Sequence, residues 1–104
     1  MVHVEMLYRG SDLCGFRMEG HAGGKAGSDI VCAAISSAVY MAANTVTDVC
    51  GVNAKTQVED GYFFLITPPD GTARAADVLE GLRLHLLALQ QQYPKRLNVD
   101  SVNI

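Results

Sequence analysis

Two tight-turn signals, Gly10-Ser11-Asp12 and Asp60-Gly61, constrain the fold of this chain more than any other feature. Each signal lies between two short segments rich in strand-forming residues: 2–8 and 14–19 around the first, 54–59 and 62–66 around the second. In all but the last segment, apolar and polar residues alternate, which is typical of strands with one buried face. An Asp-Gly pair favours a two-residue hairpin turn. The sequence therefore predicts two hairpins.

Each predicted hairpin precedes a long segment in which apolar residues follow helical spacing. The first segment, residues 30–50, has Ser28 or Asp29 as its expected N-cap and Gly51 as its stop. The second segment, residues 72–92, ends before Pro94. The predicted core-facing stripes are Val31, Ile35, Val39, Ala42, Val46 and Val49 in the first helix, and Val78, Leu82, Leu86, Leu89 and Tyr93 in the second.

Together with a last strand over residues 97–104, these elements predict an α+β fold in the order ββαββαβ. Because tight turns join the strand pairs, we expect a mostly antiparallel sheet with two packed helices. A length of 104 residues suits one domain, and we expect a single domain over residues 1–104.

Charge and cysteine content narrow the classes of function. The net charge is −3, from 8 basic and 11 acidic residues, so direct nucleic-acid binding has no electrostatic support. Three cysteines without a C-x-x-C pair indicate reduced thiols in the cytoplasm, and we expect no metal and no cofactor. The N-terminal residues lack a secretory apolar region, and the apolar runs look too short and interrupted to cross a bilayer. We therefore expect a cytoplasmic protein without membrane contact.

The glycine-rich segment before the first predicted helix carries the candidate chemistry. His21 opens this segment, and Cys32 follows it eleven positions later. With Asp29 as N-cap, Cys32 falls at the third helical position, where the helix dipole and unpaired N–H groups stabilise a thiolate or an oxyanion. A histidine nearby can take the thiol proton. The pattern therefore predicts a nucleophile and its base.

Helical spacing puts Cys32, Ser36, Tyr40 and Asn44 at successive i+4 positions, on a stripe more polar than the core stripe. We therefore expect Cys32 at the edge of the buried face, within reach of a substrate. The alternatives are core packing for Cys32, a surface role for His21 and phosphate binding by the glycine-rich loop. Structural or surface roles are expected for the remaining candidates, Cys14, Cys50, His3 and His85.

The segment Gly20-His21-Ala22, followed by Gly27-Ser28-Asp29-Ile30-Val31-Cys32-Ala33-Ala34-Ile35-Ser36, closely resembles the ribosomal-processing cysteine protease family. The resemblance implies that His21 is the general base and Cys32 the nucleophile, with Gly20, Asp29 and Ser36 in supporting positions. It also implies a homodimer that removes the N-terminal extension of the bacterial ribosomal protein L27, cutting after a Phe-Phe sequence. Two other classes stay open: a non-enzymatic ribosome-associated assembly factor, and a redox thiol protein.

Overall fold

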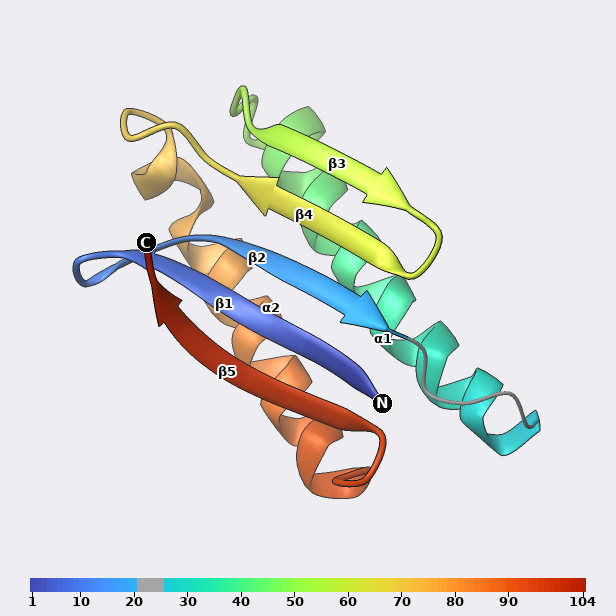
Figure 1. Cartoon of the computed structure of the whole chain (residues 1–104). Coiled ribbons are helices and arrows are strands. Elements are labelled where there is room, and N and C mark those ends of the chain that lie inside the picture. Colours follow the sequence, from blue (N-terminus) through green and yellow to red (C-terminus); the bar gives the residue numbers. More distant parts are fainter. Residues whose placement is uncertain (21–25) are drawn as a thin grey trace.

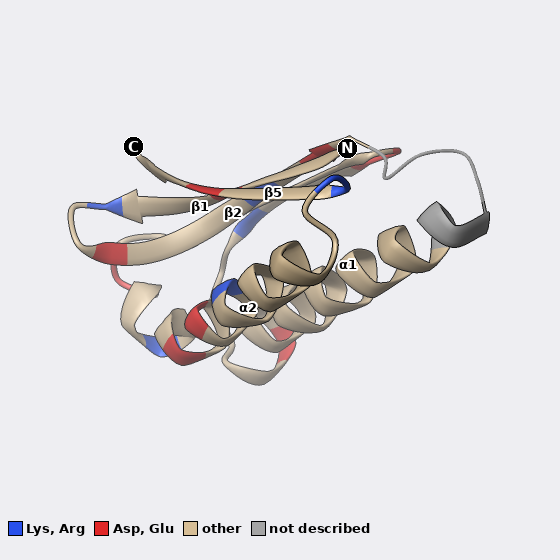
Figure 2. Cartoon of the chain, turned by 90° about the horizontal axis from the view of Figure 1, so that it is seen from below, with Lys and Arg blue, Asp and Glu red and all other residues tan. Residues whose placement is uncertain are grey.

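The computed structural model describes residues 1–20 and 26–104, with the backbone alone for residues 26–29. Five strands form one sheet in the order β3-β4-β2-β1-β5, and both helices pack against the same face of it (Figures 1 and 2). The elements in chain order are β1 (Val2–Arg9), β2 (Asp12–Gly20), α1 (Ala26–Asn44), the short π-helix η1 (Thr45–Val49), β3 (Lys55–Glu59), β4 (Tyr62–Ile66), α2 (Thr72–Gln92) and β5 (Leu97–Asn103).

The predicted α+β class and the order ββαββαβ are confirmed. The sheet is mostly antiparallel, with antiparallel pairing of β1 with β2, β2 with β4, and β3 with β4. The pair β1–β5 is parallel. Because α2 spans the sheet between β4 and β5, it returns the chain to the end at which β1 begins, and parallel pairing follows. The hairpin turn at Asp60-Gly61 forms as predicted, with Gly61 at a φ of 70°.

The stripe of α1 that faces the sheet is largely as predicted, since Val31, Ile35, Val39, Ala42 and Val46 are all buried. Val49 is an exception, because 78% of it is exposed. The helix widens into η1 over Thr45–Val49, where the Cys50 N–H donates to the Thr45 carbonyl, five residues earlier. This wider turn changes the angle between successive residues, and it rotates Val49 away from the core.

The predicted stripe of α2 is partly wrong. Leu82 and Leu86 are buried as expected, but Ala75 and Leu79 complete the buried stripe. The predicted residues Val78, Leu89 and Tyr93 are only partly buried and pack at the border of the core. Because apolar residues follow one another closely along this helix, two neighbouring stripes have helical spacing, and contact with the sheet selects between them.

One helical stretch, Ile30–Val49, is long and apolar enough to cross a membrane by length and composition alone. By this criterion the expectation that every apolar stretch is too short is wrong. The core helix of a soluble protein meets the same criterion. In this chain, the stretch includes much of the helix face that packs under the sheet (Figure 2).

Candidate active site

A cleft of about 490 Å³ opens at the end of the sheet where β2 ends and β1 begins. Cys32, Ser36 and Tyr40 of α1 line one side of it. The other side consists of the β3–β4 turn and the adjoining strand ends, residues 58–63. A volume of this size lies in the range of small-molecule sites, so the cleft can hold several side chains of a peptide.

Cys32 occupies the border between the core and this cleft. It is half-buried, packs against the hydrophobic core and lines the cleft. Ser36, one turn further along α1, is also half-buried, and Tyr40, one turn beyond, is 46% exposed. The expectation of an accessible, partly polar stripe is confirmed for these three residues. Asn44, the fourth member, is exposed.

The beginning of α1 differs from the prediction. The helix begins at Ala26, so Ser28 and Asp29 lie inside it instead of at its N-cap. Cys32 therefore lies in the second turn, where its N–H bonds to the carbonyl four residues earlier. The helix dipole acts mainly within the first turn. The prediction that Asp29 is the N-cap is therefore wrong. The prediction that the N–H of Cys32 is free to bind an oxyanion is wrong for the same reason.

Gly20 ends β2 at the mouth of the cleft, in a conformation that requires glycine. Its φ is 101°, and a Cβ at this position would lie 2.5 Å from the Met1 carbonyl oxygen. Its N–H donates to the Gly61 carbonyl at 2.9 Å, which ties the end of β2 to the β3–β4 turn. Because only glycine fits here without strain, Gly20 sets the direction in which the chain leaves the sheet toward His21.

Two predicted groups cannot be placed beside Cys32. His21, the predicted general base, lies outside the described residues, and the side chain of Asp29 lies outside them too. The pairing of His21 with Cys32 and the supporting role of Asp29 therefore stay predictions. Gly20 and Ser36 are brought to the same cleft as Cys32.

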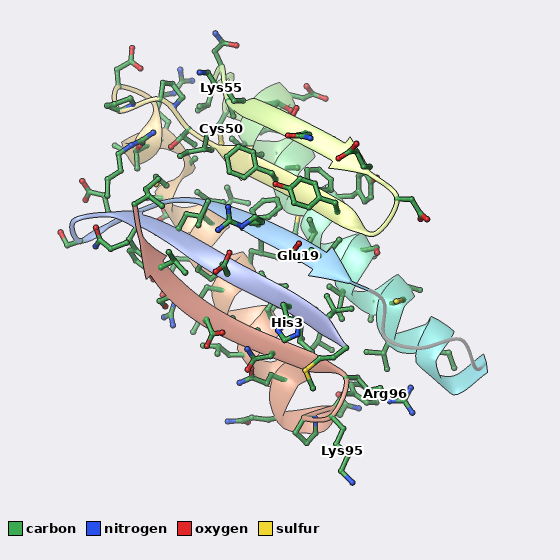
Figure 3. All side chains as sticks on the ribbon, in the orientation of Figure 1. His3, Glu19, Cys50, Lys55, Lys95 and Arg96 are labelled. Carbon is green, nitrogen blue, oxygen red and sulfur yellow. The ribbon has the colours of Figure 1, made fainter. Side chains whose placement is uncertain are left out.

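The other two cysteines lie away from the cleft. Cys14 is buried, as predicted, and its Sγ donates to the Leu7 carbonyl at 3.3 Å. Burial raises the pKa of its thiol. Cys50 is half-buried near Lys55, where β3 begins, at the opposite end of the hairpin from the cleft (Figure 3). Among the described residues, no disulfide joins any of the three cysteines.

The two histidines within the described residues are both exposed. His3 lies on β1, with Glu19 as its cross-strand partner (Figure 3). His85 lies on α2 and lines a groove between the two helices. It was expected to have a structural role, but its side chain is exposed and not part of the core. Within residues 1–20 and 30–104, no three His, Cys, Asp or Glu side chains come together as a possible metal site.

Sequence reasoning missed the second side of the cleft, which includes Val58, Glu59 and Phe63. The turn at Asp60-Gly61 marked this hairpin, but its place beside Cys32 depends on the pairing of β4 with β2. Pairing between hairpins joins residues far apart in the sequence, and local turn signals do not determine it.

A half-buried cysteine on the wall of a cleft meets the first requirement of a cysteine protease, a nucleophile that a peptide can reach. The family model described as cysteine protease Prp matches residues 1–98, and the chain belongs to this family. It is 30% identical over 91 residues to the ribosomal processing cysteine protease Prp of Bacillus subtilis (strain 168), covering 81% of each chain.

Solved structures support the same fold. The essential ribosomal processing protease Prp from S. aureus, in complex with a substrate peptide, superposes with a TM-score of 0.87 at 20% identity, covering 98% of this chain and 100% of that one. SMU.848 from Streptococcus mutans superposes with a TM-score of 0.85 at 22% identity, covering 100% and 96%. At these identities the likeness concerns the fold.

Proposed function

We propose that this cysteine protease is an endopeptidase that removes the N-terminal extension of the large-subunit ribosomal protein L27, cutting after a Phe-Phe sequence. The observation that carries the proposal is the position of Cys32 on the wall of a cleft that can take peptide side chains. Relatives of this family are named ribosomal processing proteases, and the S. aureus structure is described with a substrate peptide.

In the proposed mechanism, His21 takes the proton from the Cys32 thiol, and the thiolate attacks the scissile carbonyl. The C–N bond of the tetrahedral intermediate then breaks, and His21 returns the proton to the leaving amine. Water hydrolyses the thioester that remains, releasing the acyl half and restoring the thiol. Because the N–H of Cys32 is bonded within α1, the oxyanion needs donors from elsewhere in the site.

Ser36 is a candidate for a supporting role in this mechanism. It lies one helical turn from Cys32 on the same wall of the cleft. A hydroxyl both donates and accepts hydrogen bonds, so Ser36 can orient the thiol or the attacking water. The apolar residues Met18 and Ile35 also line the cleft, and they suit the phenylalanine side chains of the proposed substrate.

We also propose that the enzyme acts in the cytoplasm as a homodimer, without contacting nucleic acid or membrane. The net charge of −3 supports the first of these exclusions, and the dimer rests on the family resemblance. Sedimentation equilibrium at micromolar concentration tests the dimer, since a monomer mass throughout would contradict it.

The function is tested with a synthetic peptide that carries the L27 N-terminus of the same organism. Incubation followed by mass spectrometry should show a single cut after Phe-Phe, and Cys32→Ser should abolish it while the circular dichroism spectrum stays unchanged. An intact peptide, or a cut that Cys32→Ser leaves equally fast, would overturn the proposal. The second of these results would favour the non-enzymatic assembly factor.

A further inference from the structure

A second cavity, of about 460 Å³, lies at the end of the sheet away from Cys32, where β1 and β4 end and β3 begins. Two cationic side chains from separate strands line it, Arg9 of β1 and Lys55 of β3. No acidic side chain of the described residues lines it, and the rest of its lining is uncharged. A hollow lined by one sign of charge and by apolar walls attracts ions of the opposite sign.

The Arg9 side chain is anchored by a buried group of hydroxyls. Its Nη1 donates to Thr72 Oγ1 at 3.5 Å. The Thr72 hydroxyl in turn donates to the Pro68 carbonyl at 3.1 Å and lies 2.8 Å from Thr67 Oγ1, on a fully buried residue. Among the described residues this is the one side-chain hydrogen bond of Arg9. Because a guanidinium carries five N–H donors in a fixed fork, most of them are available to a ligand.

The acidic residues nearest in the chain do not neutralise the two cations. Asp12 faces Arg9 across the β1–β2 pair, and Asp70 follows Pro69 in the loop before α2. Neither lines the cavity, and within residues 1–20 and 30–104 no ion pair joins either carboxylate to Arg9 or Lys55. Two like charges beside one cavity repel each other, and a bound anion would relieve this repulsion.

The beginning of α2 adds positive potential to this end of the molecule. Thr72, the hydrogen-bond partner of Arg9, is the first residue of the helix. The N-cap, Gly71, has no side chain to cap the helix, and no acidic residue lies in the first turn. Arg74 in that turn contributes a further cation. The positive end of the helix dipole, which favours anions nearby, is therefore not offset by a local carboxylate.

We propose that this cavity binds a phosphate group, either free phosphate or a phosphate monoester of a small molecule. Arg9 binds the phosphate oxygens through its remaining N–H donors, Lys55 contributes a second charge, and the Asn53 amide in the lining is a further donor. Two cations balance the two charges of a phosphate. The volume also leaves room for a small organic group beside Ile66 and Pro68. This site lies at the opposite end of the sheet from Cys32 and does not rest on the proposed function.

The test is a titration of the ¹⁵N-labelled protein, followed by NMR of the backbone amides. Inorganic phosphate, glycerol 3-phosphate and acetate are added separately at pH 7.5 and constant ionic strength, where a phosphate monoester carries close to two negative charges. Phosphate or its ester should shift the amide signals of Arg9, Asn53 and Lys55 in a saturable way. Acetate should bind more weakly, because one charge leaves a cation unbalanced.

Variants assign the binding to the cavity. Arg9→Gln and Lys55→Gln should each raise the dissociation constant at least about tenfold, through the loss of charge-assisted hydrogen bonds. Lys95→Gln is the matched control, because it removes the same charge from an exposed lysine at the other end of the molecule (Figure 3), and it should keep the wild-type constant. Lys55 is exposed on an edge strand, so Lys55→Gln tests the site even where Arg9→Gln disturbs folding.

The outcomes decide both the site and the source of the phosphate. Saturable binding of either phosphate compound at these residues supports the site, and the tighter of the two identifies free phosphate or the ester as the ligand class. Shifts that do not saturate, that centre elsewhere or that Lys95→Gln reduces equally would overturn it. Equal binding of acetate would overturn the assignment to phosphate. A short single-stranded RNA that binds here while both small phosphates fail would also contradict the proposal. No peptide is cleaved in this titration, so its result leaves the protease assignment untouched.

Discussion

Cys14 and Cys32 put the same side chain into two opposite settings within one small domain. Cys14 lies at the bulge where the β1–β2 register shifts, fully buried, with its Sγ donating to the Leu7 carbonyl. Cys32 lies half-buried on the wall of a cleft. Burial raises the pKa of the Cys14 thiol and excludes reagents from it, so the setting and not the residue type decides which cysteine is available for chemistry.

The largest expected difference between the two cysteines concerns activity. Cys32→Ala should lower kcat/KM for the peptide of the proposed substrate by at least about a thousandfold, because no other group replaces the nucleophile. Cys14→Ala should keep kcat/KM within about twofold and instead lower the free energy of unfolding by about 1–2 kcal/mol, through the small cavity it leaves. Peptide kinetics and urea unfolding of both variants measure these effects.

The contrast between the two cysteines is contradicted if Cys14→Ala loses activity or Cys32→Ala keeps it. An active Cys32→Ala enzyme would remove Cys32 from the chemistry. An inactive but stably folded Cys14→Ala enzyme would mean that the buried thiol takes part in the reaction.

Thiol alkylation should rank the three cysteines without any substrate. In the native protein, iodoacetamide should modify Cys32 first, Cys50 more slowly, and Cys14 at least about a hundredfold more slowly than Cys32, since access to Cys14 requires local opening. Peptide mapping by mass spectrometry after timed quenching gives the three rates. A Cys32 that reacts no faster than Cys14 would indicate that the cleft is closed to small reagents.

The sequence predicted the parts of the fold that depend on local signals. The two hairpins follow from turn residues that lie beside the strands they join, and α2 begins and ends as the sequence indicates. The strand order and the parallel pair β1–β5 depend on contacts between distant segments. The position of Val49 depends on η1, a wider helical turn that helical periodicity does not reveal.

The site was predictable to a similar extent. The i+4 spacing of Cys32, Ser36 and Tyr40 correctly predicted an accessible stripe at the edge of the buried face, and in the structure this stripe lines one side of the cleft. The N-cap at Asp29 was wrong, because Gly27 marked a loop while the helix already begins at Ala26. The facing side at Val58 and Phe63 was missed, since no local pattern reports that β4 pairs with β2.

Two glycines of β2, Gly15 inside the strand and Gly20 at its end, extend the comparison to the backbone. A Cβ on Gly15 would lie 2.1 Å from the Leu65 carbonyl oxygen, so Gly15→Ala must force β2 and β4 apart. We expect a loss of about 3 kcal/mol in the free energy of unfolding. Gly20→Ala should cost about 1–2 kcal/mol, since the chain end at Met1 can move, but it should lower kcat/KM by redirecting the chain toward His21.

Gly81→Ala is the matched control for both variants. A Cβ at Gly81 meets no described atom within 4 Å, and the residue lies inside α2. This variant should gain about 0.5–1 kcal/mol, because alanine favours the helix more than glycine does. Urea unfolding of the three variants measures their free energies of unfolding and ranks them. A Gly20→Ala enzyme with full activity would show that the conformation of Gly20 is not needed for the reaction.

The last contrast between the two cysteines concerns the pH dependence of stability that Cys14 causes. Burial raises the pKa of its thiol in the folded protein, whereas the unfolded chain ionises near its ordinary value of about 8.5. The folded state therefore binds more protons above that pH. The stability that Cys14 contributes is fully present below pH of about 8.5, and it is lost at up to about 1.4 kcal/mol per pH unit as the pH rises toward the folded pKa.

Urea unfolding of the reduced protein, measured from pH 7.5 to 10, tests this expectation. The free energy of unfolding should fall more steeply with pH for the wild type than for Cys14→Ala. Parallel curves would mean that the buried thiol does not retain its proton on folding, and the contrast with Cys32 would then reduce to exposure alone.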